Sequence, residues 1–189
     1  MRGDDAKMLP RYPACMRIAH LRFSPILACL LAVATVAAQQ PGAAPKAEKD
    51  TLLVLAASHE PLRLSVAELK AMSQTTVTIH NSHTNADETY AGVRLTDLLA
   101  KVGAPSGSEL RGKALANYIV ATGSDGYQSV LALAEVDPSF HPGEVLVANA
   151  MNGKPLDEYS GPLKLVVTED KRPARSVRNL TTIELKSAQ

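Results

Sequence analysis

The sequence predicts an α/β (mixed α+β) domain, in which a few helices pack on a mixed sheet. Short β-rich runs alternate with one or two helical patterns, and the loops between them vary in length. No internal repeat is visible. A regular βαβ array would have a helix after each strand, and the one or two helical patterns are too few for that. Residues 51–189 are expected to fold as this one domain.

Several runs have the composition of β-strands, because apolar and β-branched residues dominate them or alternate with polar ones. The Asn152-Gly153 pair that follows one of these runs is typical of a tight hairpin turn, which needs positive φ angles. The runs are Thr51–Ala57, Thr75–His80, Ala116–Thr122, Tyr127–Leu133, Val145–Met151, Leu163–Thr168 and Leu180–Leu185.

Two segments have helical patterns. Ser65 precedes an apolar stretch and Glu68 follows three residues later, which is the arrangement of a capping box. Arg94–Val102 has the apolar spacing of an amphipathic helix, and Gly103 and Pro105 would end it.

Residues 1–38 resemble a secretory signal peptide. Arg17 and Arg22 form a positive region before the apolar run Ile26–Ala38, and Met16 is an alternative start of the chain. The run is too short for the roughly 20 residues that span a bilayer, so no stable membrane span is expected. We therefore expect a periplasmic or secreted protein, with residues 39–50 as a flexible linker.

Charge and cysteine content exclude several function classes. The chain has 20 Lys and Arg against 19 Asp and Glu, so no overall field favours nucleic acid. Cys15 and Cys29 both precede the predicted domain, so that domain has no thiol for a disulfide, a nucleophile or a metal. Cys29 is also an alternative lipidation site, although most of the apolar run follows it instead of preceding it.

Basic residues gather near the C-terminus and predict an anion site. The alternative is an exposed charged turn, since Glu169 and Asp170 lie beside them. The cluster comprises Lys171, Arg172, Arg175 and Arg178.

Other polar residues suggest weaker hypotheses. His80 and His83, with His59 elsewhere, could bind a metal, but a solvated loop explains them better, and no third ligand has a fixed spacing. Asp87 and Glu88 could contribute, although a solvated turn explains them equally well. Asp125 and Tyr127, in the Gly123–Tyr127 segment, could contact a ligand, or they could shape a turn and fill the core.

Several segments, in order, resemble the molybdopterin-binding domain of sulfite-oxidase-like oxidoreductases. They begin with Gly-Val-Arg-Leu-Thr-Asp-Leu-Leu and end with a basic Arg-Ser-Val-Arg segment before a β-run. The matching segments are 92–99, 123–127, 145–156, 161–167 and 175–178.

The resemblance implies an α/β fold around a mixed sheet and a molybdopterin whose metal also binds a protein cysteine. It implies that Ser176, Val177 and Arg178 contact the pterin phosphate, and we take Arg175 as a fourth cofactor-binding residue. The family's cysteine falls on Ile79–Thr84, where this sequence has none.

Two hypotheses follow. The first is an exported molybdopterin-binding oxidoreductase-like domain that binds a pterin or another anionic small ligand. The missing cysteine argues against ordinary turnover, so an enzymatic activity stays undecided. The second is a cofactor-free, non-catalytic binding or accessory module for a protein partner in the cell envelope. A deep cleft lined by Arg178 would favour the first, and a cleft filled by side chains would favour the second.

Overall fold

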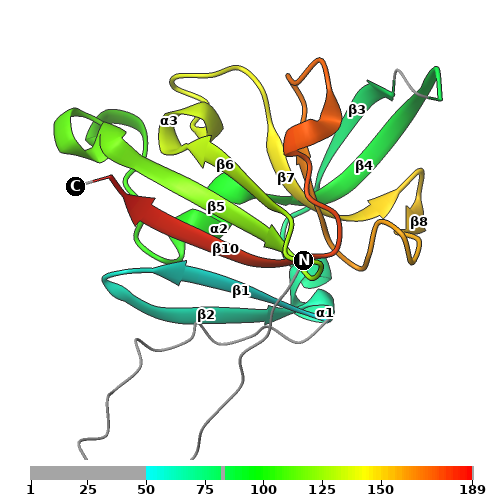
Figure 1. Cartoon of the computed structure of the whole chain (residues 1–189), viewed down its shortest axis with the longest axis horizontal. Helices are drawn as coiled ribbons and strands as arrows, with labels where there is room; N and C mark the ends of the chain where they lie inside the picture. Colours follow the sequence, from blue (N-terminus) through cyan, green and yellow to red (C-terminus); the bar gives the residue numbers. More distant parts are fainter. Residues whose placement is uncertain (1–49, 82–83, 189) are drawn as a thin grey trace, which may run out of the picture. The chain divides into compact units, whose positions relative to one another are not determined.

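Two five-stranded sheets carry most of the structure (Figure 1). The computed structural model describes residues 50–81 and 84–188, which belong to the second of two units in the chain, Ala43–Gln189. The predicted signal peptide and nearly all of the linker lie outside the described residues.

The first sheet is mixed, as the sequence predicts. Its parallel pair brings the first and last described strands side by side, with Leu53 opposite Thr182, and its other neighbours are antiparallel. The strand order is β2 (His59–Ser65), β1 (Thr51–Ala56), β10 (Leu180–Ser187), β5 (Asn117–Gly123) and β6 (Gln128–Ala132).

The second sheet is antiparallel throughout, and β7 (Val145–Met151) is its central strand. One side of β7 pairs with β4 (Ala86–Arg94), which pairs in turn with β3 (Thr75–Asn81). β7 also pairs with two short strands, β8 (Lys154–Pro155) and β9 (Lys164–Val167).

Short helices connect the strands. The predicted capping box is present at α1 (Val66–Ala71): the Glu68 N–H donates to the Ser65 hydroxyl over 3.2 Å, and the Ser65 N–H donates to the Glu68 carboxylate over 2.8 Å. The other helices are α2 (Leu95–Ala100), α3 (Leu133–Val136) and the 3₁₀ turns η1 (Gly107–Glu109), η2 (Gly112–Ala116) and η3 (Pro173–Arg175).

One hydrophobic core joins both sheets. Leu52 and Ile119 from the first sheet and Val147 from the second are fully buried in it, together with Leu98 of α2. A smaller cluster on the second sheet contains Tyr90, Ala148 and Val166, with half-buried side chains around it. The mixed α/β class is therefore confirmed, with two sheets where the sequence indicated a single one.

The strand β4 was missed by the sequence reading, which placed Asp87 and Glu88 in a solvated turn. Both residues lie in β4, where Glu88 is opposite Ile79. Gly92 allows this strand to approach β7, since a Cβ atom there would lie 2.2 Å from the Val147 carbonyl oxygen.

The strand β2 was also missed. It contains Pro61 and lies at the edge of the first sheet, which is where a strand accepts a proline. No helix of the described residues is long and apolar enough to span a membrane.

Candidate functional site

The loop between β9 and β10 carries the predicted anion site, and backbone hydrogen bonds hold it against neighbouring segments. The Leu165 N–H donates to the Val177 carbonyl over 2.8 Å, and the Asn179 N–H donates to the Ser160 carbonyl over 2.8 Å. Val177 is fully buried in the core. Its burial anchors the loop between Ser176 and Arg178.

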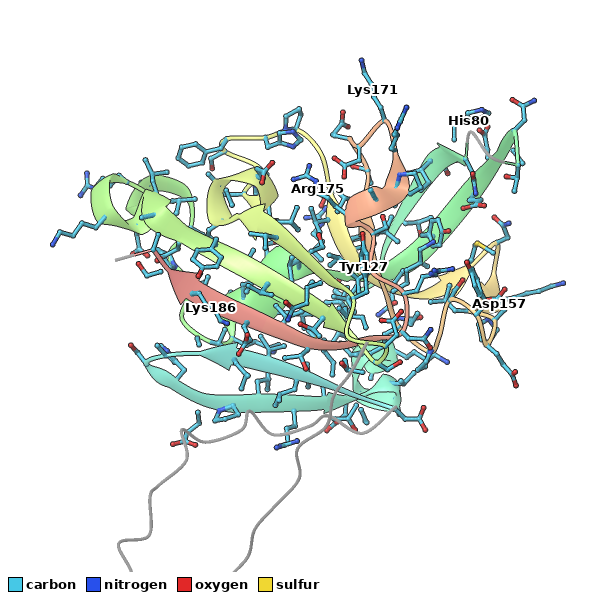
Figure 2. The ribbon with its side chains drawn as sticks, viewed as in Figure 1. His80, Tyr127, Asp157, Lys171, Arg175 and Lys186 are labelled. Atoms are coloured by element: carbon cyan, nitrogen blue, oxygen red, sulfur yellow. The ribbon has the colours of Figure 1, made fainter. Side chains whose placement is uncertain are left out.

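Ser176 and Arg178 line a pocket of about 450 Å³. Figure 2 shows Tyr127, another lining residue, close to η3, and its hydroxyl donates to the Ala174 carbonyl over 2.5 Å. The pocket is lined by Asp125, Tyr127, Tyr159, Lys164, Pro173, Ala174, Ser176 and Arg178.

The Arg178 guanidinium lies over the ring of Tyr159, 3.8 Å from the ring centroid. Stacking of this kind uses the flat face of the guanidinium and leaves the N–H groups at its edge free to donate. Arg178 is exposed and has no carboxylate partner among the described residues. Its charge is thus available to an anion in the pocket.

Lys164 is a second cation of the pocket, and the sequence reading did not identify it as a site residue. Its Nζ donates to the Tyr90 hydroxyl over 2.7 Å, and that hydroxyl donates to Glu88 over 2.7 Å. The Nζ also lies 4.6 Å from the centroid of the Tyr90 ring. Tyr90 and Glu88 therefore fix the position of the ammonium group.

Burial changes the pKa values of Lys164 and Tyr90. It lowers the pKa of Lys164, against the opposing effect of the Glu88 and Asp157 carboxylates. It also raises the pKa of Tyr90, and the hydrogen bond to Glu88 raises it further. Tyr90 therefore stays neutral at physiological pH and serves as a hydrogen-bonded support for Lys164.

Arg175 has a different environment from Arg178. Its guanidinium donates to Asp170 over 2.9 and 2.6 Å and to Glu135 of α3 over 2.9 Å. These hydrogen bonds raise the pKa of Arg175, and they direct the side chain to carboxylates of the protein itself. Of the four residues predicted to bind the cofactor, Ser176 and Arg178 line the pocket, whereas Arg175 is ion-paired and Val177 is buried.

The turn before β6 also contributes to the pocket. The Tyr127 N–H donates to the Asp125 carboxylate over 2.9 Å, which supports the prediction that this pair shapes a turn. Tyr127 is 49% exposed, so the expectation that it fills the core is wrong. Asp125 and Tyr127 both line the pocket and can contact a ligand there.

The proposed histidine metal site gains no support in the described part of the chain. His80 is bonded to Asp87 over 2.9 Å at an exposed position, and His59 lies on the other sheet. His83 lies outside the described residues. Residues 50–81 and 84–188 contain no group of three His, Cys, Asp or Glu side chains placed to hold a metal.

The side chains of the pocket fit one part of a molybdopterin. Two cations and a hydroxyl suit its phosphate, because guanidinium and ammonium groups make charge-assisted hydrogen bonds to phosphate oxygens. A thiolate that could bind the metal is missing, since the chain's only cysteines are Cys15 and Cys29, far upstream of the pocket segments. The residues therefore fit the anionic end of the cofactor and not the metal.

A known protein family matches the described residues. The family model described as the oxidoreductase molybdopterin-binding domain matches residues 41–189. The chain belongs to this family. The resemblance seen in the sequence is thereby confirmed, and the matched residues include both sheets and the loop between β9 and β10.

A solved structure of similar fold is that of the sulfane dehydrogenase SoxCD from Paracoccus pantotrophus. Its chain superposes with a TM-score of 0.58 at 20% sequence identity, over 75% of this chain and 40% of that chain. The similarity shows a shared fold, and this chain spans well under half of the SoxCD chain. No curated protein matches the sequence.

Lys164 and Tyr159 were missed for different reasons. Lys164 lies in a run that was correctly predicted as a strand, and its polar character within that apolar run is the signal that marks it. Tyr159 lies in a loop, and its sequence neighbours do not indicate that it meets Arg178.

Proposed function

We propose that this protein is exported and binds a molybdopterin, or another anionic small ligand, in the pocket of Lys164, Ser176 and Arg178. The proposal rests on two cations, Lys164 and Arg178, that line one open pocket of about 450 Å³. Pockets of this size accommodate small molecules, and a few convergent polar groups fix their orientation. The open pocket supports a ligand-binding domain over a domain whose cleft is filled by side chains.

Arg178 would bind the phosphate through the edge of its guanidinium, while the Tyr159 ring holds the flat face. Lys164 would add a second positive charge, directed by its hydrogen bond to Tyr90. A bound molybdopterin supplies redox chemistry through its metal. No catalytic residue is assigned, because the residues after Cys29 offer the metal no thiolate.

The first experiment is production of the protein without a metal-chelating tag in a host that makes molybdenum cofactor. Bound molybdenum and released pterin are then measured per chain. Pterin close to one per chain, lost in Arg178→Ala and kept in Arg63→Ala, would support the proposal; Arg63 is an exposed arginine on β2, outside the pocket. A folded protein without pterin or any other bound anion would contradict it.

The second candidate function is a cofactor-free accessory module of the cell envelope, with a protein partner. The lack of a cysteine anywhere after Cys29 favours it, since the metal would lack its protein ligand. Pterin without molybdenum would favour binding of the organic ligand alone. Absence of both in protein recovered after export would favour the accessory module.

Export is tested separately by the mass of the protein recovered from the periplasm and the medium. Cleavage after Ala37 or Ala38 removes the predicted signal peptide and gives a new N-terminus. Replacing Arg17 and Arg22 by glutamate should hold the uncleaved chain in the cytoplasm. Cleavage unaffected by these replacements would contradict the assignment of this segment.

A further inference from the structure

The strand β3 has an unpaired edge in the described structure. It pairs with β4 on one side, and no described strand pairs with its other side. Unpaired N–H and C=O groups on such an edge offer a template for another strand. The seven residues from Thr75 to Asn81 include no proline, glycine, lysine, arginine or acidic residue.

The other edges of the sheets are protected. β2 contains Glu60, Pro61 and Arg63, and charges and proline hinder strand addition. The outer side of β9 is bonded to the loop that carries Val177, through the Leu165 N–H.

The edge at β6 is shorter and is flanked by contacts. β6 has five residues, whereas β3 has seven. Tyr127 before β6 bonds to Ala174, and Glu135 after it pairs with Arg175. Among the edges of the described structure, β3 therefore combines greater length with the absence of proline, lysine, arginine and acidic residues, and no described strand pairs with its outer side.

The two faces of β3 differ in polarity. Val77 and Ile79 pack against the smaller hydrophobic cluster around Tyr90 and are half-buried. Thr76, Thr78 and His80 lie on the other face and are exposed. Such alternation fixes the register of any added strand, because a slip of one residue would place apolar side chains against the polar face.

We propose that β3 pairs antiparallel with β3 of a second copy of this chain, with the two-fold axis at Thr78, and that the protein forms a homodimer through this edge. In this register Val77 lies opposite Ile79 of the second copy, on the face of the smaller cluster. Thr78 lies opposite its own copy, and Thr76 lies opposite His80. The strand is thus self-complementary: apolar residues meet on one face and polar residues meet on the other.

The dimer leaves the ligand pocket open. Pocket residue Lys164 lies on β9, and β4 and β7 separate β9 from β3 in the sheet. The interface is small because a single strand contributes from each copy, so the dimer should depend on protein concentration. This inference does not rest on ligand binding, and a cofactor-free protein should dimerise in the same way.

The first test is sedimentation velocity of the full chain over a series of concentrations, comparing the wild type with two lysine variants. Thr78→Lys places two like charges opposite each other at the axis. Thr89→Lys is the matched control, because Thr78 and Thr89 share one side-chain hydrogen bond of 3.0 Å and either change removes it. Only Thr78 lies on the free edge.

A dimer of the wild type that persists in Thr89→Lys and is lost in Thr78→Lys would support the proposal. A monomeric wild type at every concentration would overturn it, as would a dimer that Thr78→Lys leaves intact. Association through residues outside the domain would be the same in both variants, so the comparison isolates β3. A variant that fails to fold is recognised by its circular dichroism, and the cross-linking test below then decides.

The second test uses a disulfide as a direct probe of the register. In a chain with Cys15→Ser and Cys29→Ser, Thr78→Cys leaves a single thiol, and two copies at the axis have Cα atoms about 4.5–5.5 Å apart, within disulfide range. Thr89→Cys in the same background would lie about 14 Å from its copy, three strand spacings away. Rapid oxidation to a dimer in Thr78→Cys alone supports the register, and equal rates in the two variants overturn it.

Discussion

The two sides of the β9–β10 loop use the same residue type differently. Arg175 makes hydrogen bonds to two carboxylates, Asp170 and Glu135, and connects the loop to α3. Arg178 has no carboxylate partner among the described residues and lies over Tyr159 at the rim of the pocket. Clustering of basic residues in the sequence therefore does not establish a shared role, because neighbouring carboxylates can neutralise part of the cluster.

The largest effect should come from Arg178, on ligand binding and not on folding. Arg178→Ala should weaken binding of an anionic ligand by about 2–3 kcal/mol, as expected for loss of charge-assisted hydrogen bonds. Its free energy of unfolding should change by less than about 0.5 kcal/mol, because the side chain is exposed. Calorimetric titration with inorganic pyrophosphate measures the affinity, and urea denaturation measures the free energy of unfolding. An affinity equal to that of the wild type would show that Arg178 does not bind the ligand.

Lys164 should have a smaller effect on the same affinity. Lys164→Met keeps much of the aliphatic volume and removes the ammonium, and we expect a loss of about 1–2 kcal/mol in binding. Lys154→Met is the control, because Lys154 is an exposed lysine on β8 that does not line the pocket. If both variants lost affinity equally, general charge and not the pocket would explain the binding.

Arg175 should affect stability. Arg175→Met should lower the free energy of unfolding by about 1–2 kcal/mol, a value reduced from that of buried charge pairs because solvent screens a partly exposed side chain. The Arg175 side chain is 37% exposed, and its partner Asp170 is 16% exposed. Urea denaturation measures the loss. A stability equal to that of the wild type would show that the contacts to Asp170 and Glu135 do not hold the loop.

The same ion pairs predict a pH dependence. Partial burial raises the pKa of Glu135, but hydrogen bonds from the Ala132 N–H and from Arg175 outweigh it and hold the pKa below its usual 4.5. A carboxylate with a lowered pKa stabilises the fold above its usual pKa, and this contribution is lost as the pH falls through the folded value. The difference in free energy of unfolding between the wild type and Arg175→Met should therefore shrink by about 1 kcal/mol or less between about pH 5 and pH 3. A constant difference over that range would contradict the assignment.

Much of the fold could be predicted because local patterns and tertiary structure agree. The run Val145–Met151 became β7 with the same bounds, and Asn152 has the positive φ, 52°, that its turn required. β4 was missed because its first residues are charged and Gly92 interrupts the β-rich pattern. Its signal was the alternation of Glu88, Tyr90 and Gly92 toward the buried side.

The site could be predicted less well, because its contacts are distant in sequence. Lys164 bonds to Tyr90, which lies 74 residues earlier, and no local pattern predicts that meeting. The family resemblance pointed to the loop of Ser176 and Arg178, which lines the pocket, but it did not separate Arg178 from Arg175. That separation depends on Glu135, which pairs with Arg175 from 40 residues away.

Tyr159 should have the smallest effect and gives the finest test of the contrast between the two arginines. Tyr159 is 71% exposed, and a cation–π contact at such a site is worth about 0.5–1 kcal/mol, so Tyr159→Ala should weaken pyrophosphate binding by up to that amount. Tyr159→Phe should bind like the wild type, because the aromatic face and not the hydroxyl holds the guanidinium. In an Arg178→Ala background, Tyr159→Ala should cost almost nothing further, since the ring then has no guanidinium to orient. Equal losses in both backgrounds would show that Tyr159 contacts the ligand directly and does not act through Arg178.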